Sequence, residues 1–251
     1  MNIPKQSQPC DLAVQIRARY QSAVEQVEKA LSDSKRKPGS ARIIVVTKAQ
    51  PVEVLKAAFQ AGLHCFGENY PEETLTKIET MKELPGIEWH MIGHLQTRKI
   101  PIVVNHFSML HSLDSVRLAE RLNLRLVRTG KTLPVLIEIN VGDETSKYGF
   151  KARNSADLES HYQDFEKIMR LENLEIKGLM TMPPLFEDPE QSRPYFKRLY
   201  EMRAALAQKY PEICWEELSM GTSADYAVAV QEGATYVRIG QAIVGPRPAR
   251  I

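Results

Sequence analysis

The chain has 251 residues, of which 43% are hydrophobic and 25% are charged. This is the composition of a globular protein that can bury one substantial core. Its 33 basic residues barely exceed its 31 acidic ones, so the formal net charge is +2. This charge balance does not indicate binding to nucleic acid or to an anionic membrane. No secretory signal and no long apolar run is seen, which favours the cytoplasm. The cysteines are few and widely spaced, which indicates reduced thiols rather than disulfides; they are Cys10, Cys65 and Cys214.

The N-terminal segment, residues 1–40, predicts a helical extension. Asp11 is a suitable N-cap, and the apolar residues from Leu12 to Leu31 recur at steps of three and four. The stretch KRKPGS then breaks the pattern. We therefore expect one helix with a single buried stripe ahead of the rest of the fold.

Residues 41–247 alternate between strand-like and helical patterns. The predicted strands are Ile43–Val46, His64–Gly67, Trp89–Ile92, Met109–Ser112, Val135–Asn140, Ile176–Met180, Glu217–Met220 and Tyr236–Ile239. Amphipathic helices are expected around Val52–Phe59, Ala119–Leu126, Leu158–Met169 and Tyr195–Leu206. Eight strands with intervening helices predict an α/β protein: a single (β/α)8 TIM-type barrel with an extra N-terminal helix, in one domain over 1–251. An open doubly wound sheet is the alternative, but its GxGxxG and GxxxxGK[ST] signatures are absent.

Functional side chains of such a barrel lie at the carboxyl ends of the strands and in the loops that follow. These positions hold Lys48, Asn69, His94, Asn140, Lys147, Met180, Ser223, Arg238 and Gly240. Lys48 follows the apolar run IIVV, where a lysine is unusual because burying an unpaired ammonium is costly. Desolvation would leave it a nucleophilic amine suited to Schiff-base chemistry, whereas an exposed turn lysine is the alternative interpretation.

Small and hydroxyl residues follow the last two predicted strands. Gly221, Thr222 and Ser223 come after the seventh strand, and Gly240 follows the eighth, with a short extra helix expected from Gln241. Barrels often grip a phosphate at this place through backbone N–H groups, although such residues also serve as ordinary turn formers. Because the first and eighth strands are neighbours in a closed ring, the combination with Lys48 favours a phosphorylated carbonyl ligand.

These stretches resemble a known family, the pyridoxal phosphate homeostasis proteins. The matching motifs run in order from about Arg42 to Arg247: VVTKAQP, AGLHCFGENYPEE, IEWHMIGHLQTRK, VLIEINVGDETSKYGF, IKGLMTMPP, LSMGTSADYAVAVQEGATYVRIG and GPR. The family consists of stand-alone barrels, similar to the N-terminal domain of alanine racemase, that bind pyridoxal 5′-phosphate (PLP). The resemblance implies a PLP-binding protein involved in intracellular PLP homeostasis or cofactor delivery.

The resemblance also implies roles for eight residues. Lys48 would hold PLP as a Schiff base, Arg238 would approach the pyridine nitrogen, Asn69 and Met220 would line the pocket, and the phosphate would be bound by Ser223 and the backbone around Thr222, Gly240 and Gln241. A cation beside the pyridine nitrogen disfavours its protonation and weakens the ring as an electron sink. A structural ion pair is the alternative for Arg238. The sequence departs from the family at SMGTS, where Thr222 replaces the usual methionine, at IVG for IFG, and at VTK for VSK.

Two functions of different classes remain open: a PLP carrier, and a PLP-dependent racemase or decarboxylase. Inverting an α-carbon needs acid and base groups on opposite faces of the cofactor. Racemases with this barrel take the second group from an added C-terminal domain, for which the segment after Ile239 is too short. We therefore expect a non-enzymatic monomer with, at most, weak side activity, and transient contact with PLP-dependent apo-enzymes. No metal site is expected from His90 and His94, because HExxH is absent.

Overall fold

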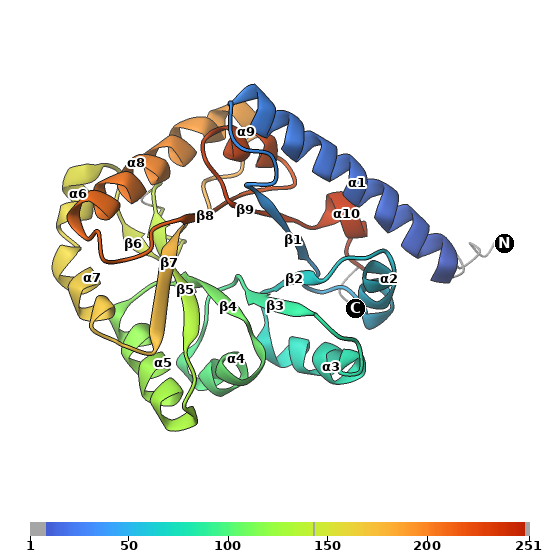
Figure 1. Cartoon of the computed structure of the whole chain (residues 1–251), viewed down its shortest axis with the longest axis horizontal. Coiled ribbons are helices and arrows are strands. Elements are labelled where there is room, and N and C mark those ends of the chain that lie inside the picture. The colour runs from blue at the N-terminus through green and yellow to red at the C-terminus, as the bar shows by residue number, and fades with distance from the viewer. Residues whose placement is uncertain (1–8, 143, 249–251) are drawn as a thin grey trace.

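Eight parallel strands close into a barrel in the computed structural model, which describes residues 9–142 and 144–248 (Figure 1). The strands are β1 (Arg42–Val46), β2 (Cys65–Glu68), β3 (Glu88–Met91), β4 (Met109–Leu113), β5 (Leu133–Asn140), β7 (Leu174–Met180), β8 (Glu217–Thr222) and β9 (Tyr236–Ile239). They pair in the order β4-β3-β2-β1-β9-β8-β7-β5, and a pairing between β4 and β5 closes the ring. A further two-residue strand, β6 (Phe150–Lys151), pairs with the end of β5 outside the ring.

The strand register brings the first and last strands of the barrel side by side. Arg42 to Val45 of β1 pair with Tyr236 to Ile239 of β9, and β8 pairs with β9 in turn. Because every pairing is parallel, the carboxyl ends of all eight strands meet at one mouth. The loops after β1, β8 and β9 are therefore neighbours at that mouth.

Helices surround the barrel on the outside (Figure 1). They are α2 (Val52–Gln60), α3 (Pro71–Met81), α4 (Ile100–His106), α5 (Val116–Thr129), α6 (Ser155–Glu159), α7 (Tyr162–Met169), α8 (Arg193–Lys209), α9 (Tyr226–Gln231) and α10 (Gln241–Val244), with short 3₁₀ turns at Thr97–Lys99 and Pro189–Ser192. None of the helices in the described ranges combines the length and apolar character needed to cross a membrane.

The first helix, α1 (Pro9–Asp33), packs across the outside of the barrel against α2, α9 and α10. Its buried stripe includes Ile16 and Leu31, which are fully buried. Two polar contacts tie this end of the chain to the other: the Tyr226 hydroxyl donates to Gln26 at 2.7 Å, and Arg36 donates to the Val230 carbonyl at 2.6 Å. The expected N-terminal helix is thus present, and residues 1–8 of the predicted extension lie outside the described residues.

Alternation along the strands divides the core in two. In β1, Ile43 and Val45 face the helices and join the main core, whereas Ile44 faces the barrel interior. The interior also contains Met109, Leu136, Met180 and Tyr236. The same interior holds buried polar side chains, namely His90, His111, Ser219 and Arg238. The barrel centre is therefore partly polar, and those groups form the connections described below.

The predicted TIM-type barrel is confirmed, with strands that start and end within two residues of the expected positions. The short helix predicted from Gln241 is also present as α10. The pattern from Leu158 to Met169 forms two helices, α6 and α7, rather than one. The sequence pattern does not predict α3 and α4. In α3 the buried face includes Thr74 and Lys77, so its apolar stripe is interrupted.

Candidate functional site

A cavity of about 520 Å³ opens at the mouth formed by the carboxyl ends of the strands. Seven of the eight residues expected at a binding site line it: Lys48, Asn69, Thr222, Ser223, Arg238, Gly240 and Gln241. Met220 does not line it. On β8, Ser219 faces the barrel interior, so the next residue, Met220, faces the helices and is fully buried in the main core. The structure therefore places Met220 in the main core, away from the pocket lining that the resemblance implies for it.

Lys48 is placed by the loop that follows β1. The preceding Thr47 is fully buried and its hydroxyl donates to Glu68 at 2.7 Å. The following Ala49 has a positive φ of 58°, a strained conformation for a residue with a side chain, and its N–H donates to Glu73 at 2.9 Å. Both neighbours of Lys48 are thus anchored from α3 and β2. These contacts hold the backbone of Lys48 at the cavity, and neither of them involves its amine.

The amine of Lys48 has no bound partner among the described residues, and its pKa is lowered. No hydrogen bond or ion pair to it is formed within the described ranges. Burial lowers its pKa from the ordinary value, and the nearby Arg247 and Arg238 cations lower it further. A larger share of the neutral, nucleophilic amine is the consequence. The other lysine at the cavity, Lys147, is engaged: its Nζ lies 2.5 Å from Glu144 and donates to the Met182 carbonyl at 2.9 Å.

A buried ion cluster lies beneath this loop. The Lys77 amine on α3 is almost fully buried and donates to Glu68 at 2.8 Å, Glu73 at 2.9 Å and the Thr47 carbonyl at 2.9 Å. Glu68 is completely buried, so its charge depends on Lys77 and on the Thr47 hydroxyl. The cluster joins α3, β2 and the Lys48 loop into one rigid unit.

The far side of the cavity is formed by the loops after β8 and β9. The N–H of Gly240 donates to the Ser223 hydroxyl at 3.2 Å. A Cβ atom at Gly240 would lie 3.2 Å from the Val46 carbonyl oxygen, so glycine allows this loop to approach β1 closely. Helix α10 begins at Gln241, and the first N–H groups of a helix have no acceptor inside it. These donors suit an anion.

Thr222 occupies the same region, but its donors are engaged. Its backbone N–H donates to Asp225 at 2.7 Å, and its hydroxyl donates to the same carboxylate at 3.1 Å. Asp225 is also the residue that precedes α9. Thr222 therefore shapes the turn, and its hydroxyl hydrogen is not directed at a ligand.

Arg238 emerges from β9 at the bottom of the cavity and is 4% exposed. It donates to the Ser219 hydroxyl at 2.6 Å and to the Thr181 carbonyl at 2.9 Å. Burial lowers the pKa of Arg238 to about 10, against the opposing effect of Asp225 and Glu138. Among described residues no carboxylate lies within ion-pair distance, so the alternative of a structural ion pair is not supported.

A hydrogen-bonded chain leads from Arg238 through the barrel. The Ser219 hydroxyl lies 2.9 Å from His111 Nδ1, and His111 Nε2 lies 2.9 Å from His90 Nδ1. Burial lowers the pKa of both histidines, that of His90 to about 4, so both rings are neutral. His90 Nε2 lies 3.6 Å from Glu88 at the opposite mouth. The two mouths are thus joined by polar side chains.

Glu138 is a residue of the cavity that the sequence did not predict. Glu138 lines it and is 9% exposed; burial, with a contribution from Asp114, raises the pKa of Glu138 to about 7. A glutamate inside the apolar stretch VLIEIN was the available signal. At the rim, the rings of His94 and Tyr148 stack with centroids 3.6 Å apart, and His94 lies 2.7 Å from Asp114.

The residues present fit a phosphorylated aldehyde such as PLP. The cavity offers one free amine at Lys48 and, opposite it, backbone donors around Gly240. The Arg238 and Arg247 cations face the same space. Within the described residues the buried Oδ1 atom of Asn69 has no hydrogen-bond partner, which leaves one acceptor for a ligand.

The proteins that are similar in sequence to this chain agree with one another in family. Residues 23–248 match the family described as "Alanine racemase, N-terminal domain". The chain is 39% identical over 229 residues to the pyridoxal phosphate homeostasis protein of Aquifex aeolicus, covering 91% of this chain and 97% of that protein. It is 34% identical to the protein of the same name in Escherichia coli K12, covering 89% and 93%.

Solved structures give the same result. PipY of Synechococcus elongatus with PLP bound is 31% identical and superposes with a TM-score of 0.78 over 92% of this chain and 100% of that chain. The PLP-free structure of PipY gives 32% and 0.80. Alanine racemase of Clostridium difficile, at 17% identity, has a TM-score of 0.67 and shows the fold alone. By its sequence over almost its whole length and by its barrel, the chain belongs to the pyridoxal phosphate homeostasis protein family.

Proposed function

We propose that this protein binds PLP as a Schiff base on Lys48 and serves PLP homeostasis or cofactor delivery. The observation that carries the proposal is the free Lys48 amine with its lowered pKa, facing the same cavity as the donors around Ser223 and Gly240. The bound PLP in the related PipY structure supports the choice of ligand.

Each end of the cavity has a separate task in this proposal. Lys48 supplies the nucleophile for the aldehyde carbon, and the loops after β8 and β9 bind the phosphate through backbone N–H groups and the Ser223 hydroxyl. The cofactor, when bound, supplies an aldehyde and a ring that can withdraw electrons. Glu68, Glu73 and Lys77 hold the Lys48 loop in place, so the amine does not have to be repositioned.

We propose a holding role rather than an enzymatic one. Arginine is a hydrogen-bond donor only, so Arg238 would hold the pyridine nitrogen of PLP unprotonated by donating to it. An unprotonated ring stabilises a carbanion poorly, which suits storage better than racemisation or decarboxylation. The likeness to alanine racemase concerns the fold alone and does not favour the enzymatic alternative.

Delivery to apo-enzymes would use the open mouth of the cavity. Three large hydrophobic side chains at this rim are exposed, namely Tyr148, Met182 and Leu185. If the protein is a monomer, no second subunit covers this rim, and an apo-enzyme can reach it. Light scattering of the purified protein tests the monomer, and transfer of PLP to an apo-enzyme tests delivery.

The direct test is an absorbance spectrum of the protein with PLP, followed by borohydride reduction and peptide mapping. A Schiff-base band that reduction fixes onto Lys48 is the expected result. Absence of the band, or label scattered over surface lysines, would contradict the proposal.

A further inference from the structure

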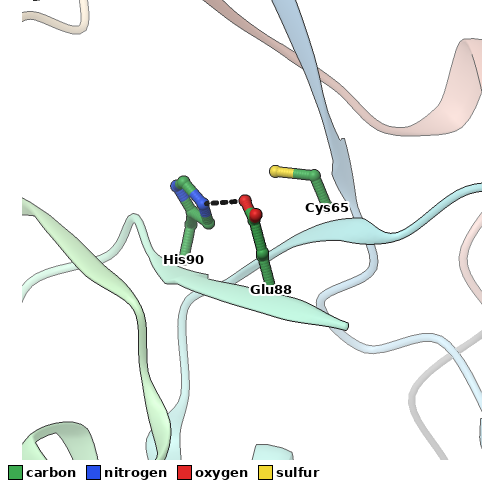
Figure 2. A group of neighbouring side chains, drawn as sticks. All are labelled: Cys65, Glu88 and His90. Atoms are coloured by element: carbon green, nitrogen blue, oxygen red, sulfur yellow. Dashed lines mark ion pairs between the residues drawn. The ribbon is translucent and has the colours of Figure 1, made fainter. Parts of the chain in front are cut away.

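The mouth opposite the cofactor cavity carries a cluster of three potential metal ligands. Cys65 lies on β2, and Glu88 and His90 lie on β3. The register pairs Cys65 with Glu88, and His90 is two residues further on, so all three side chains lie on one face of the sheet. Figure 2 shows the sulfur, the carboxylate and the imidazole gathered over the two strands. Their ligand atoms all lie within 4.8 Å of one another.

The donor set selects the kind of metal. A cysteine sulfur, a histidine nitrogen and a carboxylate oxygen are the ligands of zinc sites, whereas Mg²⁺ and Ca²⁺ prefer oxygen alone. Tetrahedral ligands at roughly 2.0–2.3 Å from zinc lie about 3.3–3.8 Å from each other. The contact between His90 and Glu88, at 3.6 Å, already has this spacing. Glu88 is 59% exposed, so its side chain can move the remaining distance without disturbing the core.

The support behind the cluster is preformed. His90 is almost fully buried, and its Nδ1 atom lies 2.9 Å from His111 Nε2. A hydrogen bond on the far nitrogen of a ligating histidine fixes the ring and directs the other nitrogen to the metal. Here that other nitrogen, Nε2, faces Glu88. The backbone of both donating strands is held in the barrel, so the entropy lost on binding is small.

The Glu88 side of the cluster is open to solvent, and both positive and negative side chains surround it. Glu88 and His90 line a cavity of about 270 Å³ together with Arg42, Lys177 and Glu217. Arg42 opposes a cation, but it is paired with Glu217 at 2.8 Å and lies over the Tyr236 ring. Lys177 is paired with Glu175 at 3.1 Å. The metal therefore has an entry path and partly neutralised neighbours.

We propose that Cys65, Glu88 and His90 form a zinc-binding site with three protein ligands at the mouth opposite the PLP cavity. Binding forms a Zn–S bond and releases the thiol proton to solvent, with no change of oxidation state. A water molecule completes the tetrahedron, as in zinc sites that keep an open position. None of these three residues lines the cavity that contains Lys48.

Titration of the chelator-treated protein with Co²⁺ tests the site. A tetrahedral Co²⁺–thiolate site gives a sulfur-to-cobalt charge-transfer band that Zn²⁺ abolishes, and the expected stoichiometry is one per chain. Cys65→Ser is expected to remove the band, and Glu88→Gln to weaken Zn²⁺ binding about tenfold or more, by calorimetry. Cys214→Ser, at an exposed cysteine elsewhere, is the matched control and should keep the band.

Thermal unfolding of each variant separates loss of the site from loss of the fold. A Cys65→Ser protein that unfolds like the unaltered chain, binds PLP and lacks the band supports the proposal. Absence of the band in the unaltered chain, or its survival in Cys65→Ser, would overturn it. The Lys48→Ala protein should bind Zn²⁺ unchanged, so failure of the PLP proposal would leave this result untouched.

Discussion

Arg238 donates a hydrogen bond of 2.6 Å to the hydroxyl oxygen of Ser219, inside the barrel and out of contact with solvent. The same oxygen lies 2.9 Å from His111 Nδ1 and can accept a second hydrogen bond from the N–H of that ring nitrogen. One hydroxyl thus satisfies a buried cation and a buried imidazole together.

Ser219→Ala is expected to destabilise the protein by about 1–3 kcal/mol, because both buried partners lose a hydrogen bond. Urea denaturation measures the change. Ser32→Ala, at an exposed position of α1, is the control and should leave the midpoint unchanged. Equal midpoints for the two variants would mean that water replaces the hydroxyl.

Lys48→Ala is expected to abolish the Schiff-base absorbance of the PLP-loaded protein, because the free amine at the cavity is removed. Lys147→Ala is the control, since that amine already pairs with Glu144 and the Met182 carbonyl. Full absorbance in Lys48→Ala would move the linkage to another lysine, and its loss in Lys147→Ala would identify that residue.

The phosphate is expected to supply much of the affinity, so pyridoxal should bind far more weakly than PLP. Ser223→Ala should weaken PLP binding about tenfold to a hundredfold, the value of a hydrogen bond to a charged group. Thr222→Ser keeps the contacts to Asp225 and should change affinity little. Fluorescence titration measures all three, and equal affinities for pyridoxal and PLP would exclude phosphate binding here.

Glu138 should make stability depend on pH. Burial raises its pKa in the folded protein from an ordinary 4.5 to about 7. Between these values the folded state retains a proton that the unfolded state releases, so stability falls as pH rises and levels off above about 7. The total fall is up to about 3 kcal/mol. Glu138→Gln should flatten this part of a denaturation-versus-pH curve, whereas the exposed Glu187→Gln should not.

Lys77→Met is expected to cost about 3–5 kcal/mol, because it leaves the fully buried Glu68 without its cation. The double variant Lys77→Met/Glu68→Gln should recover much of that loss. Thermal unfolding of the two single variants and the double variant gives the coupling energy. Strictly additive losses would show that the pair is not coupled.

The barrel, and the placement of seven of the eight expected residues around one cavity, could be predicted because parallel strands bring their carboxyl ends together. Lys48 and Gly240 lie just beyond apolar runs, and the carboxyl ends of such runs meet at one mouth. Met220 was misplaced because its side depends on the local alternation of β8, where the register shifts between Ser219 and Thr222. The resemblance of the motifs does not tell which face of β8 the Met220 side chain lies on.

The polar connections could not be predicted, because their partners come from distant parts of the sequence. The chain from Glu88 to Arg238 uses β3, β4, β8 and β9, and each member alone is an isolated polar residue in an apolar strand. Lys77 likewise reads as a surface residue of α3 until Glu68 and Thr47 are placed beside it. Only the three-dimensional arrangement shows that these groups satisfy one another.

The packing of α1 against α9 and α10 has a consequence for biosynthesis. The hydroxyl of Tyr226, at the start of α9, binds Gln26 of α1 across a separation of 200 residues in the sequence. Contacts between residues so distant in sequence form late in folding and lower the folding rate. The part of the apolar stripe of α1 that faces α9 and α10 therefore stays uncovered during translation until these two helices have emerged, and the cavity, which Gln241 at the start of α10 lines, is completed no earlier.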